Sequence, residues 1–255
     1  MIASLFLIVL SGVPSGTVMR GSAEVSPGEM IEDLRGYDGV FIGEKHDDPL
    51  AHEWELFIWE ALAEDGRVLA LEMFETDVQD VLDAYLAGEI TGEEFLEGSR
   101  PWGNYPTDYA PLVELARERG LPVIAANVPR RYAAMVASGG YGALAEEPFF
   151  MELRIDSSSV FYREKFMATM EAIGGEMHGM PMDHGNMYRA QILKDAVMAA
   201  SVAGERFVLV CGGFHSDHHS GIPDQLPGNV SVATVKILAE GEEFDEEAAD
   251  YVIVR

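Results

Sequence analysis

Short apolar runs alternate with longer amphipathic stretches along the first half of the chain. The runs at residues 37–42, 68–71 and 121–126 have the length and composition of strands that are buried on both faces. Apolar residues recur every three or four positions over residues 49–64, which predicts an amphipathic helix, and a further helix is expected over residues 109–119. Strands that alternate with helices in this order predict a parallel sheet with crossover helices.

The alternation lapses in the middle of the chain, where only helical patterns are found. Helices are expected over residues 131–138, 141–146, 159–173 and 187–203. Three later runs complete the sheet, at residues 206–211, 230–237 and 251–254. We therefore predict an α/β fold, a mostly parallel sheet flanked by helices, formed by residues 1–130 and 204–255. A small all-helical subdomain, residues 131–203, is expected to be inserted before the last strands and to lie over the ligand crevice.

Length and charge narrow the classes of partner. The chain has 255 residues, of which 48% are hydrophobic, and this is sufficient for a sizeable core. It carries 44 acidic against 17 basic residues, a net charge of -27. A surface this negative repels phosphate backbones and anionic membranes, so we expect no nucleic-acid partner.

The first ten residues are uninterruptedly apolar but too few to span a bilayer. This run has the length of a signal-peptide core without the basic residues that begin such peptides, and an N-terminal core strand is the alternative. No other segment approaches transmembrane length, so no integral membrane span is expected. Cys211 is the single cysteine, which excludes an intramolecular disulfide.

Polar residues stand where the predicted strands end. Gly43-Glu44-Lys45-His46 follows the strand predicted at residues 37–42, and Gly212-Gly213-Phe214-His215 follows a later one, so the spacing Gly-x-x-His occurs twice. Two further strands run into Glu72 and Asn127. Because the carboxyl ends of parallel strands line the crevice where ligands bind, these side chains are expected to converge.

Two imidazoles with nearby carboxylates are sufficient to hold a divalent cation such as zinc or manganese. In this hypothesis His46, Glu72 and His215 are the metal ligands. The protein would then be a metal-dependent hydrolase whose catalytic residues are Glu44, His46, Glu72 and His215, with Glu44 or Glu72 as the general base. Each residue taken alone is also explained as a satisfied polar group at a strand end.

The predicted helix 187–203 and the segment before it supply further candidates. Tyr188, Gln191 and Asp195 share one face of the helix, and the last two either reach the site or form a buried hydrogen-bond network. His178 and His184 lie in a segment rich in Gly and Met, a combination suited to axial ligation of haem iron, although methionines also fill gaps in cores. The sequence has no HExxH, phosphate-binding loop, Gly-x-Ser-x-Gly or CxxC motif.

Taken together, these segments resemble the ChaN-like haem-binding proteins of the Tiki superfamily. The resemblance spans residues 37–225 and is carried by residues 41–48, 71–74, 79, 99–105, 125–131, 188–199, 212–215 and 221–223. It implies a parallel sheet with a small helical domain and the binding of haem during iron acquisition, as a homodimer. A tyrosine axial ligand is expected of the family, and Tyr105 and Tyr188 are the candidates. Arg130 or Arg131 would pair with the haem propionates.

Haem binding is therefore the first hypothesis, the metal-dependent hydrolase is the second, and a relict site in a protein that acts through partners is the third. The resemblance also implies export to the cell envelope, with a cytoplasmic location as the alternative. Val13 follows Leu10-Ser11-Gly12 where a lipidated cysteine would stand, so no lipid anchor is expected.

Overall fold

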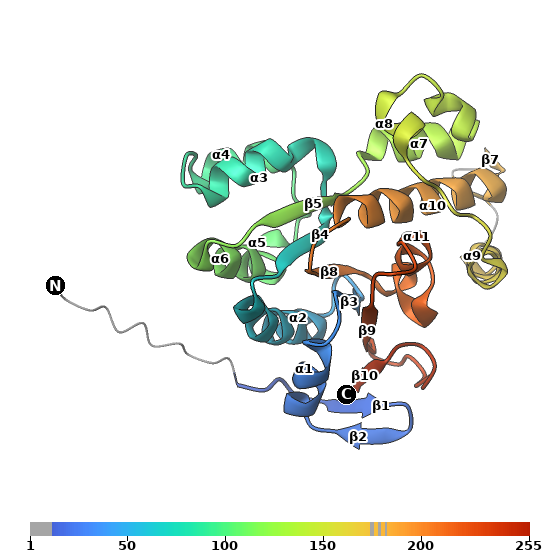
Figure 1. Cartoon of the computed structure of the whole chain (residues 1–255). Coiled ribbons are helices and arrows are strands. Elements are labelled where there is room, and N and C mark those ends of the chain that lie inside the picture. Colours follow the sequence, from blue (N-terminus) through green and yellow to red (C-terminus); the bar gives the residue numbers. More distant parts are fainter. Residues whose placement is uncertain (1–11, 174–175, 178–179, 182) are drawn as a thin grey trace.

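The computed structural model describes residues 12–173, 176–177, 180–181 and 183–255. An eight-stranded sheet runs through the molecule with the strand order β2-β1-β10-β9-β3-β8-β4-β5 (Figure 1). The expectations for residues 1–11, and for His178 as a haem ligand, fall outside the described residues.

Six strands of the sheet are parallel: β3 (Gly39–Glu44), β4 (Val68–Glu75), β5 (Val123–Asn127), β8 (Phe207–Gly212), β9 (Val232–Ile237) and β10 (Tyr251–Val254). At one edge, β1 (Thr17–Arg20) pairs antiparallel with β10, and β2 (Ala23–Val25) pairs antiparallel with β1. The prediction of an α/β fold with a mostly parallel sheet is confirmed. Each predicted strand is found, with boundaries moved by a few residues.

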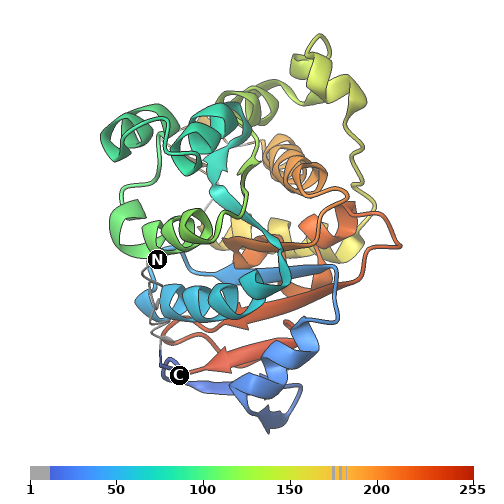
Figure 2. The same cartoon turned by 60° about the vertical axis from the view of Figure 1, so that its left-hand side comes forward.

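Helices cover both faces of the sheet (Figures 1 and 2). On one face, alternate strand residues such as Val40 and Val210 pack against α1 (Pro27–Leu34), α2 (Pro49–Leu62) and α6 (Ala110–Arg119). On the other face, Phe41 and Leu209 pack against α10 (His184–Ser201) and α11 (Ile222–Gln225). The alternation of strand side chains between two apolar layers explains why these strands read as continuous apolar runs.

The remaining elements are short and connect these layers. Two helix starts follow from capping boxes, in which Ser26 caps α1 through Glu29 and Thr91 caps α4 through Glu94. The other helices are α3 (Gln79–Leu86), α4 (Gly92–Ser99), α5 (Tyr105–Asp108), η1 (Ala63–Asp65), η2 (Thr76–Val78), η4 (Gly213–His215) and η5 (Asp217–His219).

Residues 131–203 contain the expected helices and a small hairpin besides. The segment forms α7 (Arg130–Gly139), η3 (Tyr141–Leu144), α8 (Pro148–Glu152), α9 (Val160–Ile173) and two paired strands, β6 (Glu176–Met177) and β7 (Met180–Pro181). Its last helix, α10, packs Met198, Ala199 and Val202 into the same core cluster as the sheet. Helix α10 therefore shares the sheet's core, and the boundaries of a separate subdomain stay a prediction.

Two strands extend further than their apolar runs. Strand β3 includes Gly43 and Glu44, which continue its pairing with β8, and β4 continues to Glu75, which pairs with Asn127 after an irregularity in register. Because backbone pairing continues past the apolar residues, Glu44 and Glu72 are strand residues and not loop residues.

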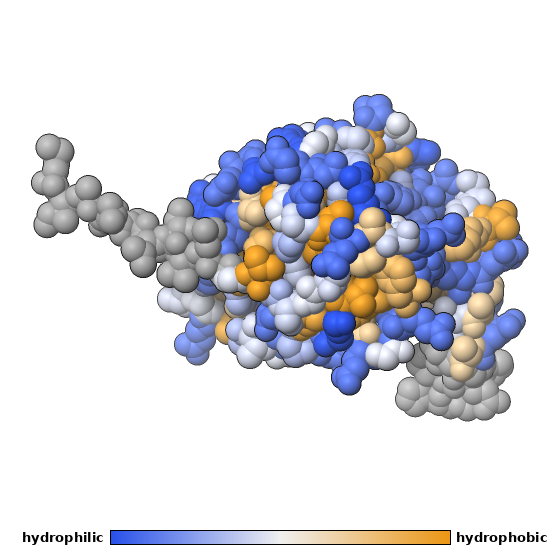
Figure 3. Space-filling model, turned by 90° about the horizontal axis from the view of Figure 1, so that it is seen from below, coloured by the Kyte–Doolittle hydropathy of each residue, from blue (hydrophilic) through white to orange (hydrophobic). Residues whose placement is uncertain are grey.

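The surface seen from below has both hydrophilic and apolar regions (Figure 3). Seen from below, the molecule presents hydrophilic residues around a central group of apolar ones (Figure 3). Among the helices that the structure describes, none has the combined length and apolarity needed to cross a bilayer.

Candidate functional site

Both Gly-x-x-His segments open into one cavity at the carboxyl edge of the sheet. Strands β3 and β8 are parallel neighbours, and Glu44 lies opposite Gly212 in the register. The chain therefore leaves both strands at the same level. His46 and His215 both line a cavity of about 420 Å³, whose other walls come from α9 and α10. Its residues are Glu44, Lys45, His46, Glu72, Phe166, Thr169, Met170, Gln191, Lys194, Gly212, Gly213, Phe214 and His215.

His46 is held through one nitrogen only. Its Nδ1–H donates to Glu44 Oε1 at 2.8 Å, and the ring meets Trp102 edge-on with centroids 4.5 Å apart. Among the described residues, Nε2 has no hydrogen-bond partner. A Cβ on Gly212 would lie 3.1 Å from Nε2, so glycine is needed there for the imidazole to approach the strand.

The charge of His46 depends on its acidic neighbours. Burial disfavours the charged imidazole, but the hydrogen bond to Glu44 and the charges of Glu72 and Glu44 outweigh it and raise the pKa of His46. Glu44 is itself fixed, because the hydroxyl of Tyr109 donates to the same Oε1 that accepts from His46. The pair therefore has one orientation, with Nε2 toward the cavity.

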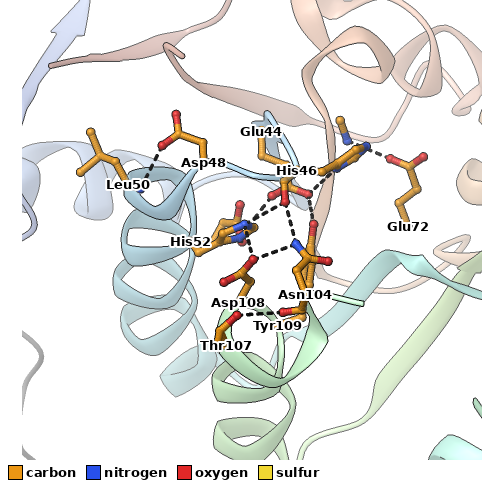
Figure 4. Close-up of polar contacts among 12 residues, drawn as sticks. Glu44, His46, Asp48, Leu50, His52, Glu72, Asn104, Thr107, Asp108 and Tyr109 are labelled. Carbon is orange, nitrogen blue, oxygen red and sulfur yellow. Dashed lines mark hydrogen bonds and ion pairs between the residues drawn. The ribbon is translucent and has the colours of Figure 1, made fainter. Parts of the chain in front are cut away.

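A buried polar network supports Glu44 from behind (Figure 4). His52 Nδ1 lies 3.0 Å from Glu55 Oε2 and 3.3 Å from Glu44 Oε2, and its Nε2 lies 3.2 Å from the carbonyl oxygen of His46. Asn104 donates to the same carbonyl at 2.7 Å. Burial lowers the basicity of His52, but Glu55 and Glu44 raise its pKa to about 9.

Glu44, His52 and Glu55 also lie close enough together to hold a cation, since one ligand atom from each lies within 4.8 Å of the others. A proton explains the same cluster. Glu55 is fully buried, and burial together with the charge of Glu44 raises the pKa of Glu55 well above its ordinary value. Protonation of Glu55, which this raised pKa favours, leaves the network with less unbalanced negative charge.

His215 is held through both nitrogens. Its Nδ1–H donates to Asp195, and its Nε2 forms an ion pair with Glu72 Oε1 at 3.2 Å. Glu72 Oε2 accepts from the backbone N–H of Gly212 at 2.8 Å, and the hydroxyl of Tyr162 donates to Asp195 Oδ2 at 2.8 Å. The ring is therefore fixed between two carboxylates that are fixed in turn.

The three groups divide their charge unequally. Burial opposes ionisation of His215, but Glu72 and Asp195 raise its pKa to about 10. Burial also opposes ionisation of Glu72, yet the charge and hydrogen bond of His215 lower the pKa of Glu72 to about 2. The pKa of Asp195 is raised, because burial outweighs the attraction of His215. The His215 imidazolium thus stabilises the ionised form of Glu72, whereas ionisation of Asp195 remains unfavourable.

The two histidines therefore have different chemistry. His46 offers a free Nε2 to the cavity, whereas both nitrogens of His215 are occupied by carboxylates. An imidazolium has no lone pair for a metal ion. All three residues predicted as metal ligands line the cavity: His46, Glu72 and His215. Glu72 and His215, however, form an ion pair with each other.

The predicted cofactor-binding residues are spread over several places. Gln191 lines the cavity and donates to the hydroxyl of Tyr162 at 3.2 Å, and Asp195 lies behind His215. Tyr105 is buried in the main core, with its ring against Phe74 and Phe95. Tyr188 packs between Tyr162 and Phe166 and lines a separate cavity of about 180 Å³.

The remaining predicted residues lie away from the cavity lining. Arg130 donates from Nε to Glu75 at the end of β4, and its neighbour Arg131 donates to Asp77 at 2.5 Å. His184 begins α10. Asn127 ends β5, and its buried Oδ1 has no hydrogen-bond partner among the described residues.

Several residues of the site were not among the predicted site residues. Tyr109 and Tyr162 orient the carboxylates beneath the two histidines, and His52 supports Glu44. A tyrosine that begins or lies within an amphipathic helix reads as a core residue, so only the fold shows that its hydroxyl reaches a carboxylate. Trp102 lies within residues 99–105, one of the segments that carry the family resemblance.

The comparisons identify one family. The sequence matches the family described as haem-binding uptake, Tiki superfamily, ChaN, over residues 30–226. No curated protein matches the sequence. The solved structure described as cofacial heme binding to ChaN of Campylobacter jejuni is similar, with a TM-score of 0.75 at 19% identity over 94% of this chain and 96% of that chain.

Two further structures have TM-scores of 0.47, which is too low to support an argument. They are the type III effector HopBA1, at 13% identity over 88% of this chain and 90% of that chain, and RRSP, a MARTX toxin effector domain from Vibrio vulnificus, at 20% identity over 90% and 37%. The family match covers most of the sequence, and the fold agrees with that of the Campylobacter jejuni protein. The chain therefore belongs to the ChaN family of haem-binding uptake proteins in the Tiki superfamily.

Proposed function

We propose that this protein binds haem in the cavity between His46 and α9, with Nε2 of His46 as an axial ligand of the iron. The observation that carries the proposal is that this nitrogen, free of partners among the described residues, lines a cavity in a chain of the ChaN family. A volume of about 420 Å³ falls in the usual range of roughly 300–1,000 Å³ for cofactor sites.

The donor set fits haem. A histidine that ligates a metal usually donates its other ring nitrogen to a carboxylate, which fixes the tautomer and increases the basicity of the ligand. His46 makes this contact with Glu44 at 2.8 Å. Phe166, Met170 and Phe214 give the cavity apolar walls suited to a porphyrin face. When bound, haem would supply the iron that this imidazole coordinates.

The same geometry argues for haem over the metal-dependent hydrolase. A catalytic metal centre needs about three protein ligands with free donor atoms. Glu72 and His215 use their donor atoms on each other and on Gly212 and Asp195. One free imidazole nitrogen is sufficient for haem but not for a hydrolytic metal ion.

The wider role in iron acquisition is part of the proposal and is supported by the family description, haem-binding uptake. Export to the cell envelope and a homodimer, which the family resemblance implies, are proposed on the same basis. Each can be tested directly, by fractionation of cells and by light scattering with and without haem.

Titration of the purified protein with hemin tests the site. We expect a saturable Soret band that is lost in His46→Gly and restored when imidazole is added, because free imidazole can occupy the vacated position. His219→Gln is the matched control, since His219 contacts Asp250 and lines none of the cavities described above.

Three further variants, Tyr105→Phe, Tyr188→Phe and His184→Ala, should keep the Soret band. Loss of the band in one of them, with His46→Gly unaffected, would assign the ligand elsewhere and refute the proposed site. Absence of any Soret change in the wild-type protein would refute haem binding itself. Stoichiometric zinc or manganese in the purified protein, lost in His215→Ala, would support the hydrolase.

A further inference from the structure

The few lysines of this acidic chain are gathered in one place. The sequence has four, Lys45, Lys165, Lys194 and Lys236, against 44 acidic residues. All four line either the His46 cavity or a second cavity of about 730 Å³ next to it. The two cavities share Glu44, Lys45, Thr169, Gly213 and Phe214. No arginine lines either of them.

Two of these lysines, Lys165 and Lys236, line the second cavity and not the His46 cavity. Lys236 Nζ donates to Asp217 at 2.7 Å and lies 2.7 Å from Glu242, so its charge is balanced locally. Lys165 Nζ lies over the ring of Phe214 at 4.5 Å and 3.9 Å from Asp217, with no hydrogen-bond partner among the described residues. Burial lowers the pKa of Lys165.

The other two lysines are available to a ligand in the His46 cavity. Among the residues that the structure describes, Lys45 forms one ion pair, with its neighbour Asp47 at 3.6 Å, and 63% of its side chain is exposed. An ion pair between groups as exposed as these contributes little. Lys194, on α10 one turn after Gln191, has no ion pair within the part of the chain that the structure describes. Both ammonium groups can therefore be redirected at small cost.

We propose that Lys45 and Lys194 form an anion-recognition rim that binds the carboxylates of the ligand in the His46 cavity, the haem propionates. This proposal rests on the proposed function. A protein with a net charge of -27 repels an anionic ligand, so a local reversal of charge is needed to admit one. Lysine supplies a mobile point charge that forms charge-assisted hydrogen bonds with carboxylates. In this proposal the rim takes the role that was expected of Arg130 or Arg131, which contact Glu75 and Asp77.

The test compares haem with haem dimethyl ester, which keeps the porphyrin and iron but lacks the two carboxylates. Binding of each is measured by Soret titration for the wild type and for Lys45→Met/Lys194→Met. The control is Arg20→Met/Arg154→Met, which removes two charges whose side chains are 55% and 65% exposed and which line neither cavity.

We expect the wild type to prefer haem over its ester by at least about tenfold, as charged hydrogen bonds allow, and the lysine variant to lose most of this preference. The control should keep it. The proposal is overturned if the lysine variant binds haem as tightly as the wild type does, or if it loses both ligands equally. A wild type without any Soret change refutes the proposed function, and this inference with it. If haem binds normally and the lysine substitutions have no effect on its affinity, only the proposed role of Lys45 and Lys194 is refuted.

Discussion

Replacing Glu72 with glutamine isolates the ion pair that holds His215. The carboxylate accepts a hydrogen bond from the backbone N–H of Gly212 at 2.8 Å and forms an ion pair with His215 Nε2 at 3.2 Å. An amide is uncharged and has one oxygen, so the variant loses the ion pair with His215 and offers an acceptor oxygen to only one of the two partners. The side chain volume is almost unchanged. The loss therefore reports charge and hydrogen bonding and not packing.

The expected magnitude follows from the pKa of Glu72, which is lowered from 4.5 to about 2. At about 1.4 kcal/mol per pKa unit, this shift corresponds to about 3 kcal/mol of stability. Breaking a buried pair typically costs about 3–5 kcal/mol, which agrees. For a chain of this size, each kcal/mol lowers Tm by about 2–4 °C, so Glu72→Gln should lower Tm by about 6–12 °C near pH 6.

The pH dependence gives a second check. Because the folded-state pKa of Glu72 is depressed, its contribution is full above the unfolded value of 4.5 and is lost as pH falls toward 2. The pKa of His215 is raised from 6.5 to about 10, so its contribution is full below 6.5 and is lost as pH rises through 10. The difference between wild type and Glu72→Gln should therefore be largest between about pH 4.5 and 6.5.

Urea unfolding at pH 3.5, 6 and 10.5 measures the difference. Glu118→Gln, at an exposed position of α6, is the control and should change stability by less than about 0.5 kcal/mol. A loss below about 1 kcal/mol at pH 6, or a loss that is the same at all three pH values, would show that Glu72 and His215 do not form an ionised pair.

Three further outcomes follow from the site. Gly212→Ala should retain the fold by circular dichroism but weaken haem binding by at least about tenfold, because a Cβ would lie 3.0 Å from Cε1 of His46 and displace the ring. His52 should titrate by NMR with a pKa near 9, and its stabilising contribution should be full below pH 6.5 and lost as pH rises through 9. Tyr162→Phe should cost about 1–3 kcal/mol in urea unfolding, since Asp195 loses a hydrogen bond at 2.8 Å in a buried site.

The edge of the sheet where ligand-binding residues gather could be predicted from the sequence. Apolar runs gave the strands, and the repeated Gly-x-x-His marked two of their ends. Parallel strands present such residues at one edge, which is why His46 and His215 line one cavity. The order of strands was not needed for that inference, although it places β3 directly beside β8.

The partners of each residue could not be predicted, because they come from elements far away in the chain. Arg130 follows a strand and was expected to be free for propionates. Strand β4 continues beyond its apolar run to Glu75, and this carboxylate binds Arg130. The uninterrupted apolar run ends at residue 71, although Met73 and Phe74 continue the apolar character of the strand beyond Glu72. Glu44 likewise receives the hydroxyl of Tyr109, a contact across 65 positions.

The two Gly-x-x-His segments are equivalent in sequence and opposite in chemistry, and the reason lies in what surrounds each ring. His46 has one carboxylate partner and keeps a free nitrogen, whereas His215 lies between Glu72 of β4 and Asp195 of α10. Two carboxylates favour the protonated form of the histidine between them, so His215 places a fixed positive charge at the back of the cavity. A histidine with one carboxylate is held as an oriented base. The number of carboxylates around each imidazole, and not the motif, therefore determines which of the two can ligate iron.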